Sequence, residues 1–542
     1  MGNPVEDCFA LALASRLWTL SFSYHDLLVF LALLGFARLA LALLQWSRPG
    51  GPAWGRYYLN CLGRSGPIPG PRGLPFLGSM GIMASPLAHR ELAACAESFC
   101  ARRLMAFSLG ENRVVITSDP DVAREILNGP NFANRPVKES ARGLMFDRAM
   151  GFAPFGSYWR NLRKIAAAHL LCSKQVAATE AQRGEIVDQM SSIIYSSVAD
   201  GSPFVTIRDM LRRASLCNMM SSVFGRRYKL GLGDDDDQEM RELLSMVDAG
   251  YDLLGKFNWS DHLPWIAGLD VQGVRLGCNE LVSQVRGFLN QIITEHRETA
   301  KDRKTGEGDK NMDFVDVLMS LEGKDKLEED DMIAVLWEMI FRGTDTVAVL
   351  IEWVIARMVI HQDIQLKVQD ELDRVVGRSR PLLESDLQST PYLTSVVKEV
   401  LRLHPPGPLL SWARLATEDT KVAGHDVPRG SIAMVNMWAI MRDPDQWPDP
   451  LEFRPERFAT RGGDADSWLS GSDLRWAPFG SGRRVCPGKS MGLTAACHWV
   501  GRLLQEFEWA AEEDHPVNLR EVLKLSCELA NPVHAKVRLR RR

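Results

Sequence analysis

The chain has 542 residues, a formal net charge of -4 and a pI near 6.3. Because nucleic-acid-binding proteins usually carry a strongly basic surface, this charge balance argues against nucleic acid as a partner. The length allows a large core, and no clear interdomain linker follows residue 80, so we expect one large body. The 10 cysteines form no Cys-x-x-Cys pair, which is typical of free thiols in a reducing compartment.

Two apolar stretches open the chain, at residues 8–20 and 27–44. The second approaches the roughly 20 residues that span a bilayer, so it predicts a membrane anchor, although Arg38 is costly at mid-membrane. The first stretch either pairs with it or lies at the interface. Arg48, Arg56 and Arg64 come next, and this positive charge places the downstream chain in the cytosol. A cleaved signal peptide is the alternative, which the free-thiol cysteines disfavour.

The body begins with a proline- and glycine-rich segment at residues 66–75, which cannot form helix and separates the anchor from the rest of the chain. Residues 104–117 are typical of a β-hairpin. Apolar residues at helical spacing predict amphipathic helices within residues 121–127, 279–296 and 366–376. Residues 234–237 and 301–311 are predicted as solvated loops, and the four carboxylates of the first lack calcium-site spacing.

Residues 331–361 are apolar on almost every side, which predicts a buried helix roughly 45 Å long. Acidic residues at 328–331 mark its start, where the helix dipole favours negative charge. Polar residues inside it gather in one place: Glu338, Arg342, Gly343, Thr344, Asp345 and Thr346. Because glycine weakens the helix there, we expect a local kink or bulge at a functional site.

A loop near the C-terminus presents Cys486. Glycine at 480, 482 and 488 supplies turn conformations, and proline at 478 and 487 excludes regular helix or strand. Arg483 and Arg484 precede the thiol and a helix follows it, and both features favour the thiolate. A lone activated thiolate suits either a nucleophile or a metal ligand.

The spacing Phe479-x-x-Gly482-x-Arg484-x-Cys486-x-Gly488 resembles the haem-binding signature of cytochromes P450. The resemblance implies that Cys486 is the axial ligand of haem iron, with Phe479 and Arg484 beside the haem. Gly343-x-Asp345-Thr346 resembles the oxygen-activation motif of the same family, which implies that Asp345 and Thr346 deliver protons. A structural loop with a buried free cysteine is the alternative for the first stretch.

Two further motifs resemble the same family. Glu399-x-x-Arg402 before a proline-rich tail resembles the P450 K helix, which implies a structural set with Arg457. Trp159-x-x-x-Arg163 resembles the C helix, which implies that both side chains reach one haem propionate while Arg414 reaches the other. The basic residues near these motifs would form the face on which a reductase docks, with solvated charge as the alternative; they are Arg160, Lys164, Arg483 and Lys489.

Arg342 departs from the family pattern, which usually has a small residue before this glycine. Residues four apart share a helix face, so Arg342 lies near both Glu338 and Thr346. Two readings stay open: an ion pair with Glu338, or binding of a carboxylate of the substrate. The predicted substrate pocket contains part of residues 138–152 together with Trp337, Phe341, Arg342, Leu409 and Leu410.

Residues 341–346 and 404–414, with the double apolar N-terminus, resemble plant P450 family 78, subfamily A. The resemblance implies a role in organ growth and leaf initiation. We therefore expect a mainly α fold with small β-sheets, with residues 1–65 as membrane anchor and linker and 66–542 as the P450 haem domain, held at the endoplasmic reticulum membrane facing the cytosol.

The expected cofactor is haem b, with electrons from NADPH through NADPH-cytochrome P450 reductase. The expected substrate is small and lipophilic, resembling a fatty acid. Two other functions stay open. A haem-thiolate isomerase acting on hydroperoxides is disfavoured by the intact Asp345-Thr346 pair, whereas the sequence does not exclude a haem sensor without catalysis.

Overall fold

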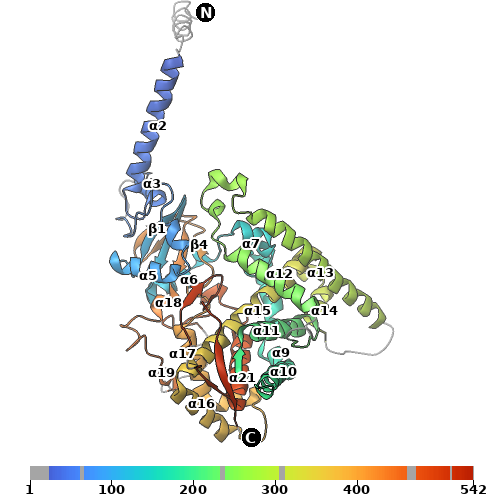
Figure 1. The fold of residues 1–542 in the computed structure, drawn as a ribbon. Helices are drawn as coiled ribbons and strands as arrows, with labels where there is room; N and C mark the ends of the chain where they lie inside the picture. Colours follow the sequence, from blue (N-terminus) through green and yellow to red (C-terminus); the bar gives the residue numbers. More distant parts are fainter. Residues whose placement is uncertain are drawn as a thin grey trace, which may run out of the picture.

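The computed structural model describes residues 24–60, 66–231, 238–303, 312–459, 471–512 and 516–540. These residues form a mainly helical body with small β-sheets, and α2 (Tyr24–Trp46) projects away from it (Figure 1). The fold class predicted from the sequence is therefore confirmed. The first apolar stretch (8–20), the acidic loop (234–237) and residues 304–311 lie outside the described residues.

The remaining helices are α3 (Pro52–Asn60), α4 (Met80–Met83), α5 (Ala88–Ser98), α6 (Pro120–Asn128), α7 (Glu139–Gly143), α8 (Ser157–His169), α9 (Ser173–Ala178), α10 (Glu180–Ala199), α11 (Arg208–Phe224), α12 (Gln238–Gly255), α13 (Val274–Arg303), α14 (Phe314–Ser320), α15 (Glu329–Ile360), α16 (Gln362–Val375), α17 (Pro391–Leu403), α18 (Met437–Ile440), α19 (Glu456–Ala459) and α21 (Lys489–Glu506). The three amphipathic helices predicted from periodicity correspond to α6, α13 and α16. Since α13 runs to Arg303, the start of the loop predicted at 301–311 is helical.

The largest sheet has the order β1 (Met105–Leu109), β2 (Asn112–Thr117), β7 (Ile432–Val435) and β4 (Arg414–Leu415). Its first two strands form the predicted hairpin, in which Leu109 pairs with Asn112 across a two-residue turn. The other sheets are β3 (Phe204–Thr206), β11 (His534–Leu539) and β8 (Phe507–Ala510); β9 (Glu521–Leu523) and β10 (Cys527–Leu529); and β5 (Thr420–Val422) and β6 (His425–Val427).

The predicted central helix is α15, whose first turn contains three acidic residues and whose remaining length is mostly buried. Of the kink or bulge expected at Gly343, the structure corrects the bulge, because α-helix continues unbroken through this residue. Gly343 has a packing role instead. A Cβ atom added there would lie 2.2 Å from Sδ of Met219 on α11, so the glycine lets the two helices approach closely.

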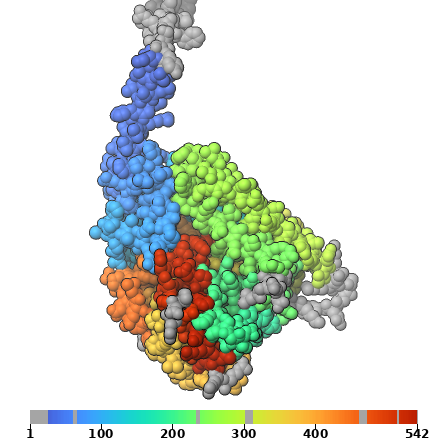
Figure 2. Space-filling model, in the orientation of Figure 1, coloured from blue at the N-terminus to red at the C-terminus, as the bar shows by residue number. Residues whose placement is uncertain are grey.

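The N-terminal segment is seated on the body more firmly than the sequence suggested. The helix at residues 25–46 is long enough and apolar enough to cross a membrane, with a mean hydropathy of 2.6 over its most apolar stretch. None of that stretch is buried in the body. It stands clear of the body in space-filling view (Figure 2). In contrast α3, which the sequence assigned to the linker, packs on β1 and β2. Trp54 is fully buried there, and its Nε1 donates to the carbonyl oxygens of Phe107 (3.2 Å) and Val114 (3.0 Å).

Candidate active site

A cavity of about 290 Å³ lies between α15 and the loop before α21. From α15, Phe341, Arg342 and Thr346 line it, and from the loop Phe479 and Cys486 do so. Two motifs about 140 residues apart in the sequence therefore meet at one cavity.

Backbone geometry explains how the loop presents its thiol. The backbone N–H of Cys486 donates to the carbonyl oxygen of Phe479 at 2.9 Å, and Gly480 and Gly482 adopt φ of 73° and 68°. A Cβ atom on Gly482 would also lie 2.3 Å from the carbonyl oxygen of Leu127 on α6, so glycine is needed here twice over. Gly488, predicted to be a third such glycine, has φ of −87° and caps α21 instead.

Electrostatics around Cys486 differ from the sequence expectation. Burial raises the pKa of the thiol, and the backbone N–H of Gly488 and the charges of Arg342, Arg163 and Arg135 work in the opposite direction. The two adjacent arginines, which the sequence predicted to favour the thiolate, donate to backbone carbonyl oxygens, and the arginines that act most on the pKa of the thiol come from other elements. Arg484 donates to the carbonyl oxygens of Ala133, Met150 and Ala153, and Arg483 to those of Asn128 and Gly129.

Five guanidinium groups line the cavity, and the charges of three of them act on a fourth, Arg135; the five residues are Arg135, Arg163, Arg342, Arg414 and Arg484. Burial lowers the pKa of Arg414 to about 9, and burial beside other arginines lowers that of Arg135 well below its usual value. Arg135 Nε and Nη1 and Arg414 Nε have no hydrogen-bond acceptor among the described residues. Because unpaired buried cations are costly, the part of the cavity at Arg135 and Arg414 is suited to anionic groups.

Trp159 and Arg163 lie at the edge of the cavity on α8. Trp159 Nε1 donates to the carbonyl oxygen of Met150 at 3.0 Å, and Arg163 Nη1 donates to that of Val485 at 3.0 Å. Arg163 lines the cavity, while Trp159 is buried behind it, with its ring centroid 4.4 Å from the guanidinium carbon of Arg484. Arg163 thus ties α8 to the thiol loop.

The acid and the hydroxyl of the α15 motif occupy different environments. Thr346 is exposed to the cavity, whereas Asp345 is buried against the turn between β9 and β10. Burial raises the pKa of Asp345, and a hydrogen bond from Ser526 partly opposes this. Arg212 of α11, 3.9 Å away, also acts to lower that pKa. Ser526 itself lines the cavity, so the carboxyl group lies one side chain behind the lining.

Of the predicted pocket residues, Phe341, Arg342 and Leu410 line the cavity, and Met150 and Gly151 represent the segment 138–152. Trp337 and Leu409 are not among the lining residues. Trp337 packs on Phe146, with ring centroids 6.4 Å apart, and Leu409 belongs to the smaller apolar core with β1 and β2. Sequence reasoning missed Arg135, Met219, Tyr251 and Leu525, which come from loops and helices without a motif.

The structure brings Glu399, Arg402 and Arg457 together in the interior. Arg402 makes a bidentate pair with Glu399, with both N···O distances 2.8 Å and both side chains fully buried. Arg457 Nε lies 3.3 Å from Oε1 of the same carboxylate. This set joins α17 to α19 and lies outside the cavity lining.

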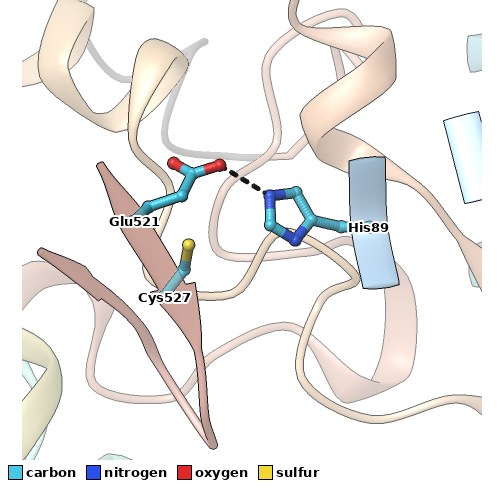
Figure 3. A group of neighbouring side chains, drawn as sticks. All are labelled: His89, Glu521 and Cys527. Carbon is cyan, nitrogen blue, oxygen red and sulfur yellow. Dashed lines mark hydrogen bonds and ion pairs between the residues drawn. The ribbon is translucent and has the colours of Figure 1, made fainter. Parts of the chain in front are cut away.

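A second buried cluster, formed by His89, Glu521 and Cys527, offers three atoms of kinds that bind metals (Figure 3). His89 Nε2 lies 2.8 Å from Glu521 Oε1, and Arg90 Nε lies 2.5 Å from the same oxygen. Because a guanidinium already pairs with the only carboxylate, a cation is disfavoured here. The cluster instead fastens α5 to the β9–β10 hairpin, whose turn lines the cavity.

Comparisons with known proteins agree with this geometry. The family model described as Cytochrome P450 matches residues 68–530. The chain is 57% identical over 518 residues to Cytochrome P450 78A9 of Arabidopsis thaliana, covering 95% of each chain, and 55% identical to Cytochrome P450 78A6 of the same plant, covering 100% of each. Among solved structures it is similar to a zebrafish cytochrome P450 determined with abiraterone, with a TM-score of 0.69 and 25% identity over 84% of this chain and 99% of that one.

Proposed function

Because this chain belongs to the cytochrome P450 family and is a monooxygenase, we propose that it hydroxylates a small lipophilic substrate with dioxygen and electrons derived from NADPH. The observation that carries the proposal is the shared cavity, in which the thiol of Cys486 and the hydroxyl of Thr346 both belong to the lining. The intact hydroxyl favours oxygen activation over isomerisation of hydroperoxides.

The lining residues fit haem b, the cofactor that the family implies. Cys486 offers a thiol for the iron and Phe479 an apolar surface, while the open donors of Arg135 and Arg414 suit the two propionates. Arg163 and Arg484 add positive charge beside them, with Trp159 behind. When bound, haem iron with a thiolate ligand supplies the activation of dioxygen, so that one oxygen atom enters a C–H bond and the other leaves as water.

The chain's own groups then have separate tasks. The Thr346 hydroxyl holds a proton at the cavity wall, and the buried Asp345 carboxyl, whose pKa is raised, can replenish it. Phe341, Met219 and Val347 offer an apolar surface to the substrate and exclude water. The protein therefore positions the substrate and supplies protons.

We also place the body on the cytosolic side of the endoplasmic reticulum membrane, with α2 as the anchor. The proposed electron donor is NADPH-cytochrome P450 reductase, docking on the basic residues Arg160, Lys164, Arg483 and Lys489. Arg160, Lys164 and Arg483 are exposed, and Lys164 Nζ lies 3.7 Å from Asp325 Oδ2. A role in organ growth and leaf initiation is proposed from the resemblance to subfamily 78A alone.

The test uses microsomes that contain the full chain and a plant reductase, supplied with NADPH, heavy-isotope dioxygen and a panel of fatty acids and other lipophilic compounds. We expect one labelled oxygen atom in the product, and no product from Cys486→Ser. A reduced carbon monoxide difference spectrum shows beforehand that the haem is bound through thiolate. Sound haem protein that forms no labelled product from the panel would contradict the proposal and favour a haem sensor.

A further inference from the structure

The guanidinium of Arg342 forms an ion pair, yet two of its nitrogens make no hydrogen bond. Its Nε lies 2.9 Å from Oε1 of Glu338, so the predicted ion pair is present. The direction of the N–H bond does not meet this oxygen, however, and Nε and Nη2, which are both buried, have no acceptor among the described residues. Glu338 Oε1 instead accepts from the backbone N–H of Gly151 at 2.8 Å.

The surroundings hold this guanidinium in one place. Its carbon lies 5.2 Å from the ring centroid of Trp412 and 5.9 Å from that of Phe152, within the range of cation–π attraction. A Cβ atom on Gly151 would lie 2.3 Å from Arg342 Nη2, so the absence of a side chain there makes room for the group. The Arg342 side chain is 33% exposed and lines the cavity. Of the three guanidinium nitrogens, Nη1 alone is not among the buried unpaired atoms, so Nη1 is the charged donor held in position for a ligand.

The charge balance of the cavity leaves room for another anion. Five arginines line it, and Glu338 is the only acidic residue among the described lining residues. Haem, with its two propionates and its thiolate ligand, offsets about two of these charges, and Glu338 offsets one. The donors of Arg484 are already satisfied by carbonyl oxygens, but Arg342 has no such partners.

We propose that Arg342 binds the carboxylate of the substrate, with Glu338, Trp412 and Phe152 holding the guanidinium in place. The inference rests on the proposed monooxygenase function and narrows its substrates to lipophilic carboxylic acids. Nη1 of the guanidinium can donate a charge-assisted hydrogen bond to a carboxylate oxygen, and the apolar residues of the same cavity accept the hydrocarbon part. Glu338 is a positioning residue, because it acts through Arg342.

The test compares dodecanoic acid with its methyl ester, which has the same chain without the charge. Binding to the haem-loaded full chain is followed by the spin-state change in the haem absorption spectrum. We expect wild type to bind the acid about tenfold more tightly than the ester, the size of one charge-assisted hydrogen bond. Arg342→Gln should weaken acid binding about tenfold and leave ester binding unchanged.

Two variants serve as controls. Arg342→Lys keeps the charge and should retain part of the preference for the acid. Arg297→Gln removes an exposed arginine from α13, where it pairs with Glu329, and should change neither affinity. A carbon monoxide spectrum confirms that each variant binds haem through thiolate. If Arg342→Gln does not bind haem, the ratio of acid affinity to ester affinity in Arg342→Lys tests the proposal instead. Tighter binding of the acid supports the proposal, and equal affinities overturn it.

The outcomes separate this inference from the proposed function. Equal affinity of wild type for acid and ester overturns the carboxylate site. Equal loss of both ligands in Arg342→Gln also overturns it, since the residue would then shape the cavity or hold haem. Acid binding that depends on Arg342, without labelled product when reductase and NADPH are present, supports the site and contradicts the proposed hydroxylation.

Discussion

Thr344, Asp345 and Thr346 are neighbours on α15, yet each side chain meets a different part of the molecule. The hydroxyl of Thr344 donates to the carbonyl oxygen of Ile340 at 2.7 Å and is buried. Asp345 faces the β9–β10 turn, and Thr346 faces the cavity. Because successive residues rotate by about 100° around a helix, one turn of α15 divides these tasks among adjacent positions.

Thr346→Ala should uncouple electron use from product formation. Without the hydroxyl at the cavity wall, the proton is delivered less well, and labelled product per NADPH should fall about a hundredfold while NADPH is still consumed. Thr344→Ala is the matched control, because its hydroxyl serves only the helix backbone. Equal coupling in wild type and Thr346→Ala would refute this role for the hydroxyl.

Glu521 makes the folding stability of the protein depend on pH in the acid range. Burial opposes its charge, but hydrogen bonds from His89 and Arg90 outweigh burial and lower its pKa to about 2. A carboxyl group whose pKa falls on folding stabilises the protein above its unfolded pKa, and this contribution is lost as the pH falls through the folded pKa. From the shift below the usual 4.5, the contribution is about 3 kcal/mol near neutral pH.

Glu521→Gln should therefore lower the free energy of unfolding by about 3 kcal/mol at pH 7 and remove this residue's share of the stability lost between about pH 5 and 2. Denaturant unfolding of the detergent-solubilised chain across this pH range measures both effects. Glu508→Gln, which removes a half-exposed carboxylate on β8, should change stability little. If the free energy of unfolding of Glu521→Gln falls at low pH as steeply as that of wild type, another carboxylate controls the acid dependence.

At the scale of elements, the thiol loop depends on its contact with α6. The 3₁₀ turn Gly482–Arg484 packs on the end of this helix, where a Cβ atom on Gly482 would also lie 2.6 Å from Oδ1 of Asn128. Ser481 Oγ donates to the same amide oxygen at 3.0 Å. The position of Cys486 is thus set by a helix more than 350 residues earlier in the chain.

Gly482→Ala should displace the loop, because alanine is strained at φ of 68° and its Cβ atom would overlap backbone. We expect loss of most of the carbon monoxide difference spectrum from protein that is still expressed. Gly287→Ala on α13 is the control, since a Cβ atom there would meet nothing within 4 Å and the residue lies outside the cavity lining. A normal spectrum from Gly482→Ala would contradict this role for the glycine.

The sequence predicted elements better than it predicted contacts. Apolar periodicity located α15 and the hairpin β1–β2 within a few residues, because each pattern reports local geometry. Motif spacing located Cys486 and Thr346. It did not reveal Arg135, since an arginine in a loop gives no sign of burial until α15 and β4 enclose it. Likewise, the reason for Gly343 lies on another helix.

At the scale of the whole molecule, the body begins earlier than the proline-rich segment that we expected to separate it from the anchor. Trp54 of α3 is fully buried, and the carbonyl oxygen of Pro69 accepts from the backbone N–H of Ala106 on β1. Both segments are therefore part of the folded body. We propose that the folded body extends back to about residue 50, whereas the sequence predicts the start of the haem domain at residue 66 and the family model begins at residue 68.

Two truncations test this boundary. Removing residues 2–46 should release the protein from the membrane fraction after a salt wash and preserve the carbon monoxide spectrum. Removing residues 2–65 deletes Trp54 and should lower the free energy of unfolding by about 3 to 5 kcal/mol relative to the shorter truncation. Trp54→Ala in the full chain should reproduce that loss. Equal stability of the two truncated proteins would place the boundary back at residue 66.

The connection between α2 and the body also restricts the angle at which the body can approach a partner protein. Trp46 Nε1 donates to the carbonyl oxygen of Gly73 at 2.8 Å, and the backbone N–H of Gly50 donates to the carbonyl oxygen of Gly70 at 3.4 Å, so the base of α2 is braced against the body. If α2 is the anchor, as proposed, this chain and its reductase meet by lateral diffusion in one bilayer, and only collisions at a suitable tilt transfer electrons. A braced base fixes that tilt, whereas a flexible tether would average over many. Inserting a few glycines after Trp46 should therefore slow electron delivery without altering the cavity.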